Sequence, residues 1–369
     1  MLRKLHLSVA LISVALIALL FTACNKKSSS ESAGSNPAII GAGSTFIFPI
    51  MTRWISAFQG NHQGVQINYQ SIGSGGGIQQ LKKGLIDFGA SDAALDDQQL
   101  KEMQPVIQIP ESAGPVCITY NLPELKEPLK LSASTLSGIF LGKIKTWQDA
   151  EIKKDNPGVK LPNHAILVAH RSDGSGTTNI FTTYLTKVSP EWASKVGKGI
   201  SVNWPTGIGG KGSEGVTGVV RQAPGSIGYT ELNYAEDNNL PVALIRNQAG
   251  VWVAPSTAGT TAAIAAFHDE LAEDVRNPIV DPPASAKDAY PICGLTYLLV
   301  PKDGQDVAKR QAVKNFIDYI ITNGQSFSDG LYYAQLPPTL IDQDQKLLGE
   351  MLAAGQPLHN SATTTSASR

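Results

Sequence analysis

Short apolar runs alternate with amphipathic segments along most of this 369-residue chain. The runs GVQINYQ, AILVAHR, GSIGYTEL and ICGLTYLLV are strand-like, because they are rich in β-branched, aromatic or aliphatic residues and are bounded by Gly, Pro or charged residues. Helix-like segments follow several of them, among them GIQQLKKGLI, TNIFTTYLTKV and VAKRQAVKNFIDYIITNG. This alternation predicts an α/β fold with mixed, mostly parallel sheets.

One helix near the start can be placed from its pattern alone. In FPIMTRWISAFQG the residues Met51, Trp54, Ile55 and Phe58 recur at the spacing of one helix face. Gly60 follows them, and glycine commonly ends a helix, so we expect the helix to close there. Four apolar residues at this spacing indicate core packing and not a cofactor site.

The beginning of the chain has the pattern of an export signal. Basic residues precede an apolar stretch from Leu7 to Phe21, and small residues then lead to Cys24. The pattern predicts a signal peptide over residues 1–23. A cysteine in this position is similar to the lipidation site of bacterial lipoproteins, where it carries acyl chains such as palmitate, and ordinary cleavage nearby is the alternative. We therefore expect an exported lipoprotein, anchored in a membrane and located in the periplasm or on the cell surface.

Polar segments of low complexity flank the central region. NKKSSSESAGSNP predicts a flexible, lipidated tether over residues 24–37, and HNSATTTSASR predicts a disordered tail over residues 359–369. The about 320 residues between them are enough for two ordinary domains or one large one. The chain holds 30 Lys and Arg against 31 Asp and Glu without a basic run, so we expect no nucleic-acid partner.

Cysteine and histidine usage argues against a metal site. Cys117 and Cys293 lie in apolar, strand-like runs, and an exported compartment permits a disulfide between them. Two buried free thiols are the alternative, and the residues leave both open. Six dispersed histidines show neither H-x-H nor H-x-x-x-H spacing, and no C-x-x-C or G-x-S-x-G motif occurs. We expect no metal, no cofactor and no enzyme activity.

Three separate loops share one design, in which Gly with Ser or Thr stands immediately before a helical pattern. They are GAGSTFIFP, SIGSGGGIQQL and HRSDGSGTTNIF. A helix N-terminus presents unpaired N–H groups and positive potential, and glycine lets an anion approach them closely. The hydroxyls of Thr45, Ser74, Ser175 and Thr177 add hydrogen-bond donors without adding charge. Three such loops predict an anion site, although the same residues also cap helices for structural reasons.

Two charged positions specify which anion this is. Arg171 matches a tetrahedral oxyanion through parallel hydrogen bonds, and it also has a structural candidate partner in Asp173, which would orient and partly neutralise it. Asp92 follows the apolar run LIDFGAS, where a solvated acid is the ordinary interpretation. If Asp92 faces the anion it can only accept a hydrogen bond, so the ligand must carry a proton. Monohydrogen phosphate has one, whereas sulfate would be repelled by about 5 kcal/mol at a separation of about 3 Å, which is roughly several thousandfold in affinity.

Six motifs in order carry a family resemblance. GAGSTFIFP, YQSIGSGGGI, DFGASDAAL, HRSDGSGTTNIF, GIGGKGSEGV and PGSIGYTEL resemble those of the phosphate-binding proteins of bacterial high-affinity phosphate ABC transporters, from about residue 39 to beyond residue 330. Two details depart from the family pattern. Ile47 follows Phe46 where Pro is common, and Gly75 stands where a second Ser is often found. Neither change removes a ligand group.

The resemblance implies a two-lobed, type II periplasmic-binding-protein fold that closes on phosphate across hinge crossover strands. One lobe would comprise residues 38–116 plus 294–358, and the other residues 117–293. Cys117 and Cys293 would then lie on neighbouring crossover strands, which favours a disulfide. The implied partners are inorganic phosphate, the permease subunits of an ABC transporter and, through the lipid, a membrane, with the protein a monomer. The implied ligand set is Thr45, Phe46 through its backbone N–H, Ser74, Asp92, Arg171, Ser175, Gly176 and Thr177, with Asp173 behind Arg171.

Other functions were weighed against this one. A protein of the same fold that binds sulfate or molybdate would share the glycine loops and differ at Asp92. A phosphatase-like enzyme would need metal ligands or an activated nucleophile, and neither is visible. A surface sensor or scaffold with a vestigial cleft would not need an intact ligand set. GIGGKGSEG resembles a P-loop, but Gly212 follows Lys211 where Ser or Thr is required, so we interpret it as a glycine-rich loop before a helix.

Overall fold

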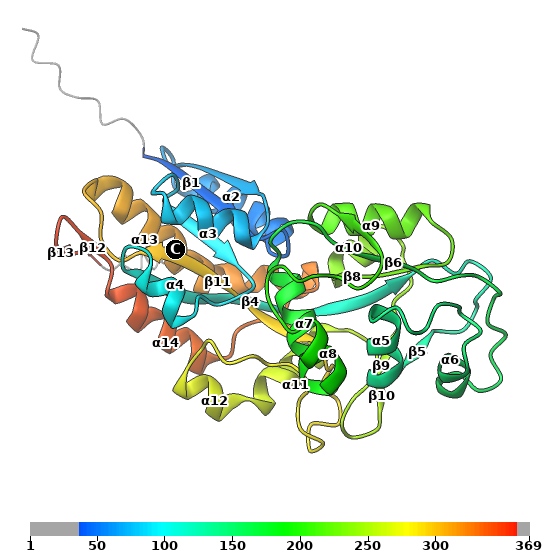
Figure 1. Ribbon diagram of the computed structural model, residues 1–369. Coiled ribbons are helices and arrows are strands. Elements are labelled where there is room, and N and C mark those ends of the chain that lie inside the picture. The colour runs from blue at the N-terminus through cyan, green and yellow to red at the C-terminus, as the bar shows by residue number, and fades with distance from the viewer. Residues whose placement is uncertain (1–36, 360–369) are drawn as a thin grey trace, which may run out of the picture. The chain divides into compact units, whose positions relative to one another are not determined.

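An eight-stranded mixed sheet forms the centre of the protein (Figure 1). The computed structural model describes residues 37–359. The strand order is β2-β1-β3-β11-β4-β8-β6-β7. These strands are β1 (Ala38–Gly43), β2 (Gln66–Ser71), β3 (Phe88–Ser91), β4 (Val106–Tyr120), β6 (Leu167–Arg171), β7 (Ile208–Gly210), β8 (Ser226–Glu231) and β11 (Cys293–Pro301). A three-stranded sheet and a two-stranded sheet are formed by β5 (Lys130–Leu131), β9 (Leu244–Arg246) and β10 (Trp252–Val253), and by β12 (Leu352–Ala353) and β13 (Gln356–Pro357).

Helices follow most strands, as the alternation predicted. Several pack directly on the sheet, with α3 against β1 and β3, α2 against β2 and α9 against β8. The helices are α2 (Phe48–Asn61), α3 (Ser74–Lys82), α4 (Asp97–Lys101), α5 (Ala133–Phe140), α6 (Ala150–Asp155), α7 (Gly176–Val188), α8 (Pro190–Lys195), α9 (Gly212–Gln222), α10 (Leu232–Asp237), α11 (Thr257–Ala266), α12 (His268–Glu273), α13 (Val307–Ile321) and α14 (Pro338–Gly349), with 3₁₀ turns η1 (Asn323–Phe327) and η2 (Asp329–Leu331).

The pairing directions confirm the α/β class with a mixed sheet. β1 pairs in parallel with β2 and β3, and β6 pairs in parallel with β7 and β8. Within the eight-stranded sheet the antiparallel pairs involve the two long strands, since β11 pairs with β3 and β4, and β4 pairs with β8. The βα alternation therefore gives the parallel parts, and β4 and β11 join them.

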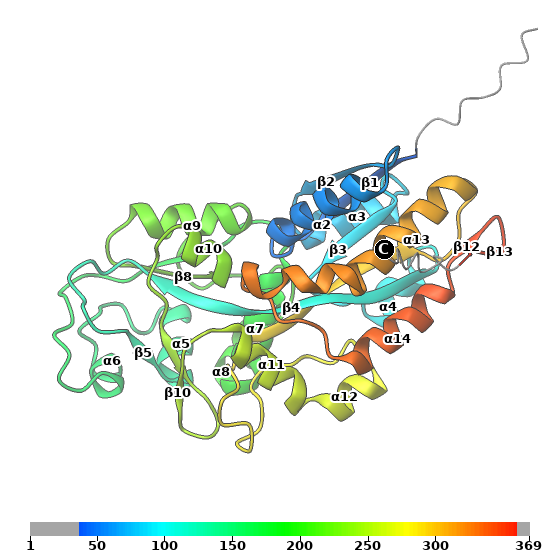
Figure 2. The same ribbon diagram turned by 180° about the vertical axis from the view of Figure 1, so that it is seen from behind.

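Strand β4 belongs to both parts of the sheet and runs from one to the other in both views (Figures 1 and 2). It pairs with β11 from Val106 to Pro115 and with β8 from Val116 to Tyr120. We call β2, β1, β3 and β11 the first half of the sheet, and β8, β6 and β7 the second half. Contacts do not divide residues 37–359 further, so the residue limits of the two lobes stay a prediction.

Helix α2 buries the predicted apolar face. Met51, Trp54 and Phe58 are buried, and Ile55 is partly buried. The indole of Trp54 donates a hydrogen bond to the carbonyl of Gly324 at 2.8 Å, so the large side chain is both packed and satisfied. The predicted end at Gly60 is wrong by one residue, because the helix continues to Asn61 and the left-handed backbone that reverses the chain belongs to a later glycine, at position 64.

The glycine run of the second loop lies inside helix α3, which begins at Ser74 and not after the glycines. The reason is a close approach of helix and strand. A Cβ atom on Gly77 would stand 2.6 Å from the carbonyl oxygen of Ala42 in β1. Glycine therefore lets α3 lie against β1 and brings its N-terminus to the strand ends.

Cys117 and Cys293 are both free, buried thiols, so the disulfide considered above is not formed. The strand register gives the reason. Cys293 lies opposite Pro115, and Cys117 is two residues further along β4. Diagonal neighbours of this kind have Cα atoms about 7–8 Å apart, beyond the usual span of a disulfide.

The predicted signal peptide, Cys24, nearly all of the tether and nearly all of the tail lie outside the described residues. Between residues 37 and 359, none of the helices combines the length and the apolar character that a bilayer crossing requires.

Candidate functional site

The third glycine loop joins β6 to α7. Strand β6 ends at Arg171, and Ser175 caps α7 by accepting the N–H of Thr178 at 3.1 Å. A Cβ atom on Gly176 would lie 2.6 Å from both Asp92 and Ser74. Glycine at this position therefore allows the first turn of α7 to press directly against residues that come from the first half of the sheet.

Asp92 faces the interior of this cluster, not solvent. Its side chain is buried, with 3 % of the residue exposed, and its two carboxylate oxygens accept hydrogen bonds from the hydroxyls of Ser44 and Ser74. Burial raises the pKa of Asp92 to about 7. The charge of Glu231 adds to this, while the two hydroxyls and the charge of Arg171 oppose it. The solvated alternative from the sequence is therefore wrong, and the site contains a carboxyl group whose charged form is disfavoured.

Arg171 is buried and forms a forked ion pair with Asp173. Its Nε donates to Asp173 Oδ1 at 2.8 Å, and its Nη2 donates to Oδ2 at 2.6 Å. Burial alone would raise the pKa of Asp173, but the hydrogen bonds and the charge of Arg171 outweigh it and leave that pKa below its ordinary value. The remaining guanidinium nitrogen, Nη1, donates to the hydroxyls of Thr177 and Ser213 at 3.3 Å each.

The predicted hydroxyls also bind one another across the cluster. Ser74 Oγ donates to Asp92 and accepts the N–H of Gly176 at 3.1 Å, so it bridges α3 and α7. Thr177 Oγ1 donates to the buried carboxylate of Glu231 at 2.5 Å. The two loops also meet through backbone alone, because the N–H of Gly75 donates to the carbonyl of Gly174 at 2.9 Å.

Three predicted positions present backbone N–H groups that have no acceptor elsewhere in residues 37–359. They are the amides of Phe46, Ser74 and Thr177, and all three residues are buried. Ser74 and Thr177 lie in the first turns of α3 and α7, where a helix leaves its amides unpaired. A buried N–H without a partner costs about 1–3 kcal/mol, so these groups call for an acceptor from outside the chain.

The cluster also contains residues that the sequence analysis passed over. Ser213, from the loop GIGGKGSEG, binds Arg171 and Thr45, and the N–H of Gly212 donates to Asp173 at 3.0 Å. Glu231 ends β8 and accepts from Thr177. The signal for the first two was present, because this loop has the same Gly-and-Ser design before a helix as the other three.

The chemistry of the cluster suits an anion. The cluster supplies mainly amide, hydroxyl and guanidinium donors. Two of its carboxyls, Asp173 and Glu231, already accept from Arg171 and Thr177, which leaves Asp92 as the acceptor for a ligand. Among residues 37–359 no group of three or more His, Cys, Asp or Glu side chains is arranged to hold a metal ion. The donors gathered around Arg171 would hold an oxyanion, and Asp92 would require it to be protonated.

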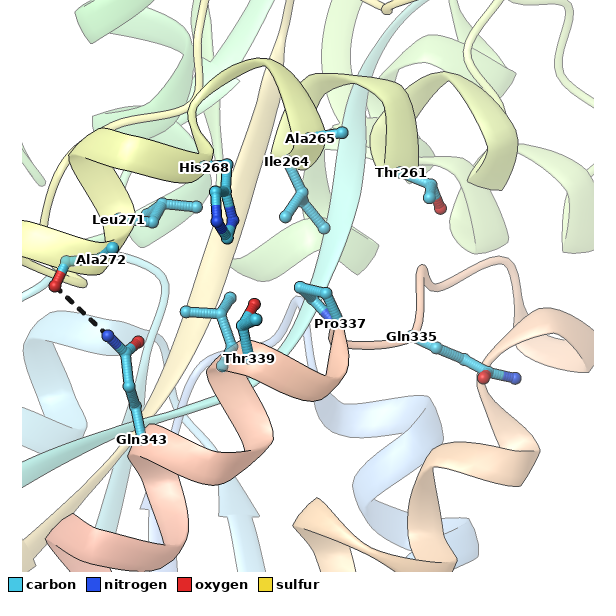
Figure 3. A pocket seen from close by; sticks show the side chains of 11 residues that line it. Thr261, Ile264, Ala265, His268, Leu271, Ala272, Gln335, Pro337, Thr339 and Gln343 are labelled. Carbon is cyan, nitrogen blue, oxygen red and sulfur yellow. Dashed lines mark hydrogen bonds between the residues drawn. The ribbon is translucent and has the colours of Figure 1, made fainter.

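Of the cavities among residues 37–359 described below, one reaches this cluster. An apolar cavity of about 430 Å³ lies between α11, α12 and α14, where Ile264 and Leu271 face Pro337 and Gln343 (Figure 3). None of the predicted ligand residues lines it. A polar groove of about 670 Å³ runs along α4, α7 and residues 274–278, and a small cavity that shares six of its lining residues reaches Asp92.

Sequence comparisons identify relatives over most of the chain. A family model described as a PBP superfamily domain matches residues 28–323. The phosphate-binding protein PstS of Xylella fastidiosa (strain Temecula1) is 46 % identical over 307 residues, covering 83 % of each chain. The phosphate-binding protein PstS of Haemophilus influenzae is 41 % identical over 305 residues, covering 82 % of this chain and 90 % of its own.

Solved structures agree in fold. The phosphate-binding protein of Stenotrophomonas maltophilia superposes with a TM-score of 0.65 at 19 % identity, covering 84 % of this chain and 93 % of its own. At that identity the similarity concerns the type II periplasmic-binding-protein fold, and it confirms the fold class expected from the sequence.

Proposed function

Since this chain belongs to the phosphate-binding proteins of the PBP superfamily, we propose that it captures inorganic phosphate and hands it to the permease of an ABC transporter. Its relatives are named as binding proteins and not as enzymes. The protein therefore acts by holding and releasing its ligand, and it leaves the ligand chemically unchanged.

The observation that carries this proposal is the set of unpaired, buried amides at Phe46, Ser74 and Thr177. They come from three of the glycine loops, and two of them belong to helix N-termini, where negative charge is stabilised. One tetrahedral oxyanion between the loops would satisfy all three. Arg171 would supply the positive charge, and the hydroxyl of Ser175 would add a donor.

Asp92 gives the proposal its specificity. Its carboxylate already accepts from Ser44 and Ser74, and a protonated phosphate oxygen would be a further donor to it. A fully ionised oxyanion would instead place a second negative charge beside the carboxylate, in a site without bulk water. Sulfate and molybdate are therefore disfavoured by the same group that accepts phosphate.

The ligand groups lie on both halves of the sheet, and this arrangement suits delivery of phosphate to a permease. Thr45, Ser74 and Asp92 belong to the first half, whereas Arg171 and Thr177 belong to the second. The donor set is complete only when the two approach, so the liganded shape differs from the open one and is what a permease would recognise. The protein would work outside the cytoplasm, as a monomer tethered through acylated Cys24.

Titration of the purified protein by calorimetry, with phosphate and then with sulfate at equal ionic strength, tests this proposal. We expect phosphate to bind at least about tenfold more tightly at about pH 8, because sulfate must either face the charged carboxylate of Asp92 or require its protonation, which costs about 1.4 kcal/mol one pH unit above a pKa of about 7. Equal affinities for the two anions would refute the role of Asp92. Absence of phosphate binding would refute the function itself.

A further inference from the structure

The loop before α9 is built into the phosphate cluster and is more than a turn. Helix α9 begins at Gly212, whose φ of +69° favours glycine, and the N–H of this residue donates to Asp173 Oδ1 at 3.0 Å. Asp173 in turn holds Arg171. The start of α9 is therefore fixed relative to the guanidinium, and the next residue, Ser213, is placed against it.

Ser213 is buried and joins the two halves of the sheet. Its hydroxyl oxygen lies 3.3 Å from Arg171 Nη1 and 2.8 Å from Thr45 Oγ1, and its N–H donates to Thr45 Oγ1 at 3.3 Å. The carbonyl of Thr45 is held as well, since it accepts the hydroxyl of Tyr234 at 2.8 Å. Thr45 belongs to the loop after β1, and hydrogen bonds from α9 and α10 hold it in place.

The direction of the hydroxyl protons can be derived from these contacts. A guanidinium only donates, so Ser213 Oγ accepts from Arg171 and its own hydrogen remains available. Thr45 Oγ1 is the nearest acceptor for that hydrogen, and it already accepts the N–H of Ser213. The hydrogen of Thr45 is then left to point at a ligand oxygen. The reverse arrangement would leave the hydrogen of Ser213 without an acceptor and would turn the lone pairs of Thr45 toward an anion.

We propose that Ser213 is a positioning residue for phosphate binding, because it relays the polarity of Arg171 to Thr45 and so makes the Thr45 hydroxyl a donor. The hydrogen bonds would then run in series from Arg171 through Ser213 and Thr45 to the ligand. Each bond in such a series strengthens the next, because hydrogen bonds in series polarise one another. Ser213 need not touch the ligand in this role. The inference rests on the proposed function and adds to it a residue outside the predicted ligand set.

The test is calorimetric titration with inorganic phosphate of the full protein and five variants, two of which complete a double-mutant cycle. Ser213→Ala should weaken binding about tenfold, because one charge-assisted chain of donors is lost. Ser213→Thr keeps the hydroxyl and should restore most of the affinity. Ser194→Ala is the matched control on α8, since its exposed hydroxyl bonds only the carbonyl of Glu191, and it should bind like the wild type.

A double-mutant cycle separates the relay from a general loosening of the loop. In a Thr45→Val background the additional change Ser213→Ala should alter the affinity by less than about twofold, because the relay has no recipient left. Thermal unfolding without phosphate shows that each variant is folded.

Three results would overturn the proposal. They are wild-type affinity in Ser213→Ala, failure of Ser213→Thr to rescue, and an undiminished effect of Ser213→Ala in the Thr45→Val background. If the wild type binds phosphate but any of these three results is found, only the role of Ser213 is refuted and the proposed function is unaffected. If the wild type binds no phosphate, both the proposed function and the role of Ser213 are refuted.

Discussion

Two aspartates lie in the same anion site and have opposite electrostatic states. Asp92, beside the loops of the first half of the sheet, accepts only from hydroxyls, and burial raises its pKa to about 7. Asp173, in the second half, is likewise partly desolvated, but Arg171 grips both of its oxygens and its pKa is lowered. The same side chain thus serves as a proton-sensitive acceptor in one place and as a permanent counter-ion in the other.

Asp92 is the more deeply buried of the two, and the partners of each carboxylate add to this difference. A hydroxyl supplies one hydrogen bond and no net charge, so it offsets only part of the desolvation of Asp92. A guanidinium supplies two hydrogen bonds and a full charge, so it overcomes the desolvation of Asp173. In this arrangement Asp173 keeps Arg171 oriented, and Asp92 stays available to distinguish a protonated ligand from a fully ionised one.

Asp92→Asn should have the largest effect on binding. An amide donates to a fully ionised oxyanion without first taking up a proton, so the affinity for sulfate should rise by about tenfold at about pH 8. The affinity for phosphate should fall about tenfold, because a charge-assisted acceptor is lost. Calorimetric titration of both anions measures the ratio, and an unchanged ratio would contradict the role given to Asp92.

The pH dependence of sulfate binding provides the control for Asp92→Asn. Because the pKa of Asp92 is about 7, lowering the pH from about 8 to about 6 protonates it and should strengthen sulfate binding to the wild type. The Asp92→Asn variant has nothing to protonate at that position, so its sulfate affinity should stay flat over the same range.

Asp173→Asn should change phosphate affinity much less, by less than about fivefold. The Asn oxygen keeps an acceptor for Arg171, and the bound phosphate replaces the lost counter-charge. The unliganded protein should lose stability by about 1–3 kcal/mol, measured by chemical denaturation, because a buried guanidinium loses its ion pair. Since the pKa of Asp173 is lowered in the folded state, this loss should shrink as the pH falls through that pKa. A large loss of phosphate affinity would show that Asp173 is more than a counter-ion.

Asp344→Asn should leave phosphate binding unchanged and alter only stability. Asp344 lies on α14, is fully buried and has no hydrogen-bond partner in residues 37–359, and burial raises its pKa to about 9. Between about pH 4 and pH 9 the unfolded chain ionises this group and the folded one does not, so wild-type stability should fall relative to the variant by up to about 1.4 kcal/mol per pH unit. Parallel denaturation curves across this range would contradict the assignment.

Local patterns predicted the elements well where one face decides the outcome. The spacing of Met51, Trp54 and Phe58 gave α2 to within a residue of its end, and the apolar runs gave β2, β6, β8 and β11. Gly60 misled because glycine is tolerated in a last helical turn, and the helix ends with the exposed Asn61, whose side-chain amide donates to the carbonyl of Ala57. The antiparallel joins of β4 with β11 and β8 are contacts between distant segments, and no local pattern encodes them.

The sequence predicted those residues of the site that lie in recognisable glycine-rich motifs. The predicted residues from Thr45 to Thr177 do converge in one cluster, although their contacts with a ligand stay predictions. Ser213 and Glu231 were missed for different reasons. The loop of Ser213 resembles an incomplete P-loop, and this resemblance hides its role beside Arg171. Glu231 ends an apolar strand and becomes relevant only because β8 lies beside β6 in the folded sheet.

Strand β4 changes neighbours between Pro115 and Val116, passing from β11 to β8. Proline has no N–H to give to a ladder, so the strand is held less tightly at the changeover than on either side of it. A twist concentrated at this point would tilt one set of loops away from the other while every helix and most of the sheet stayed intact. Uptake and release of phosphate would then require a rotation of the two halves about this point and about the segment that returns the chain to β11, and no part of the protein would have to unfold.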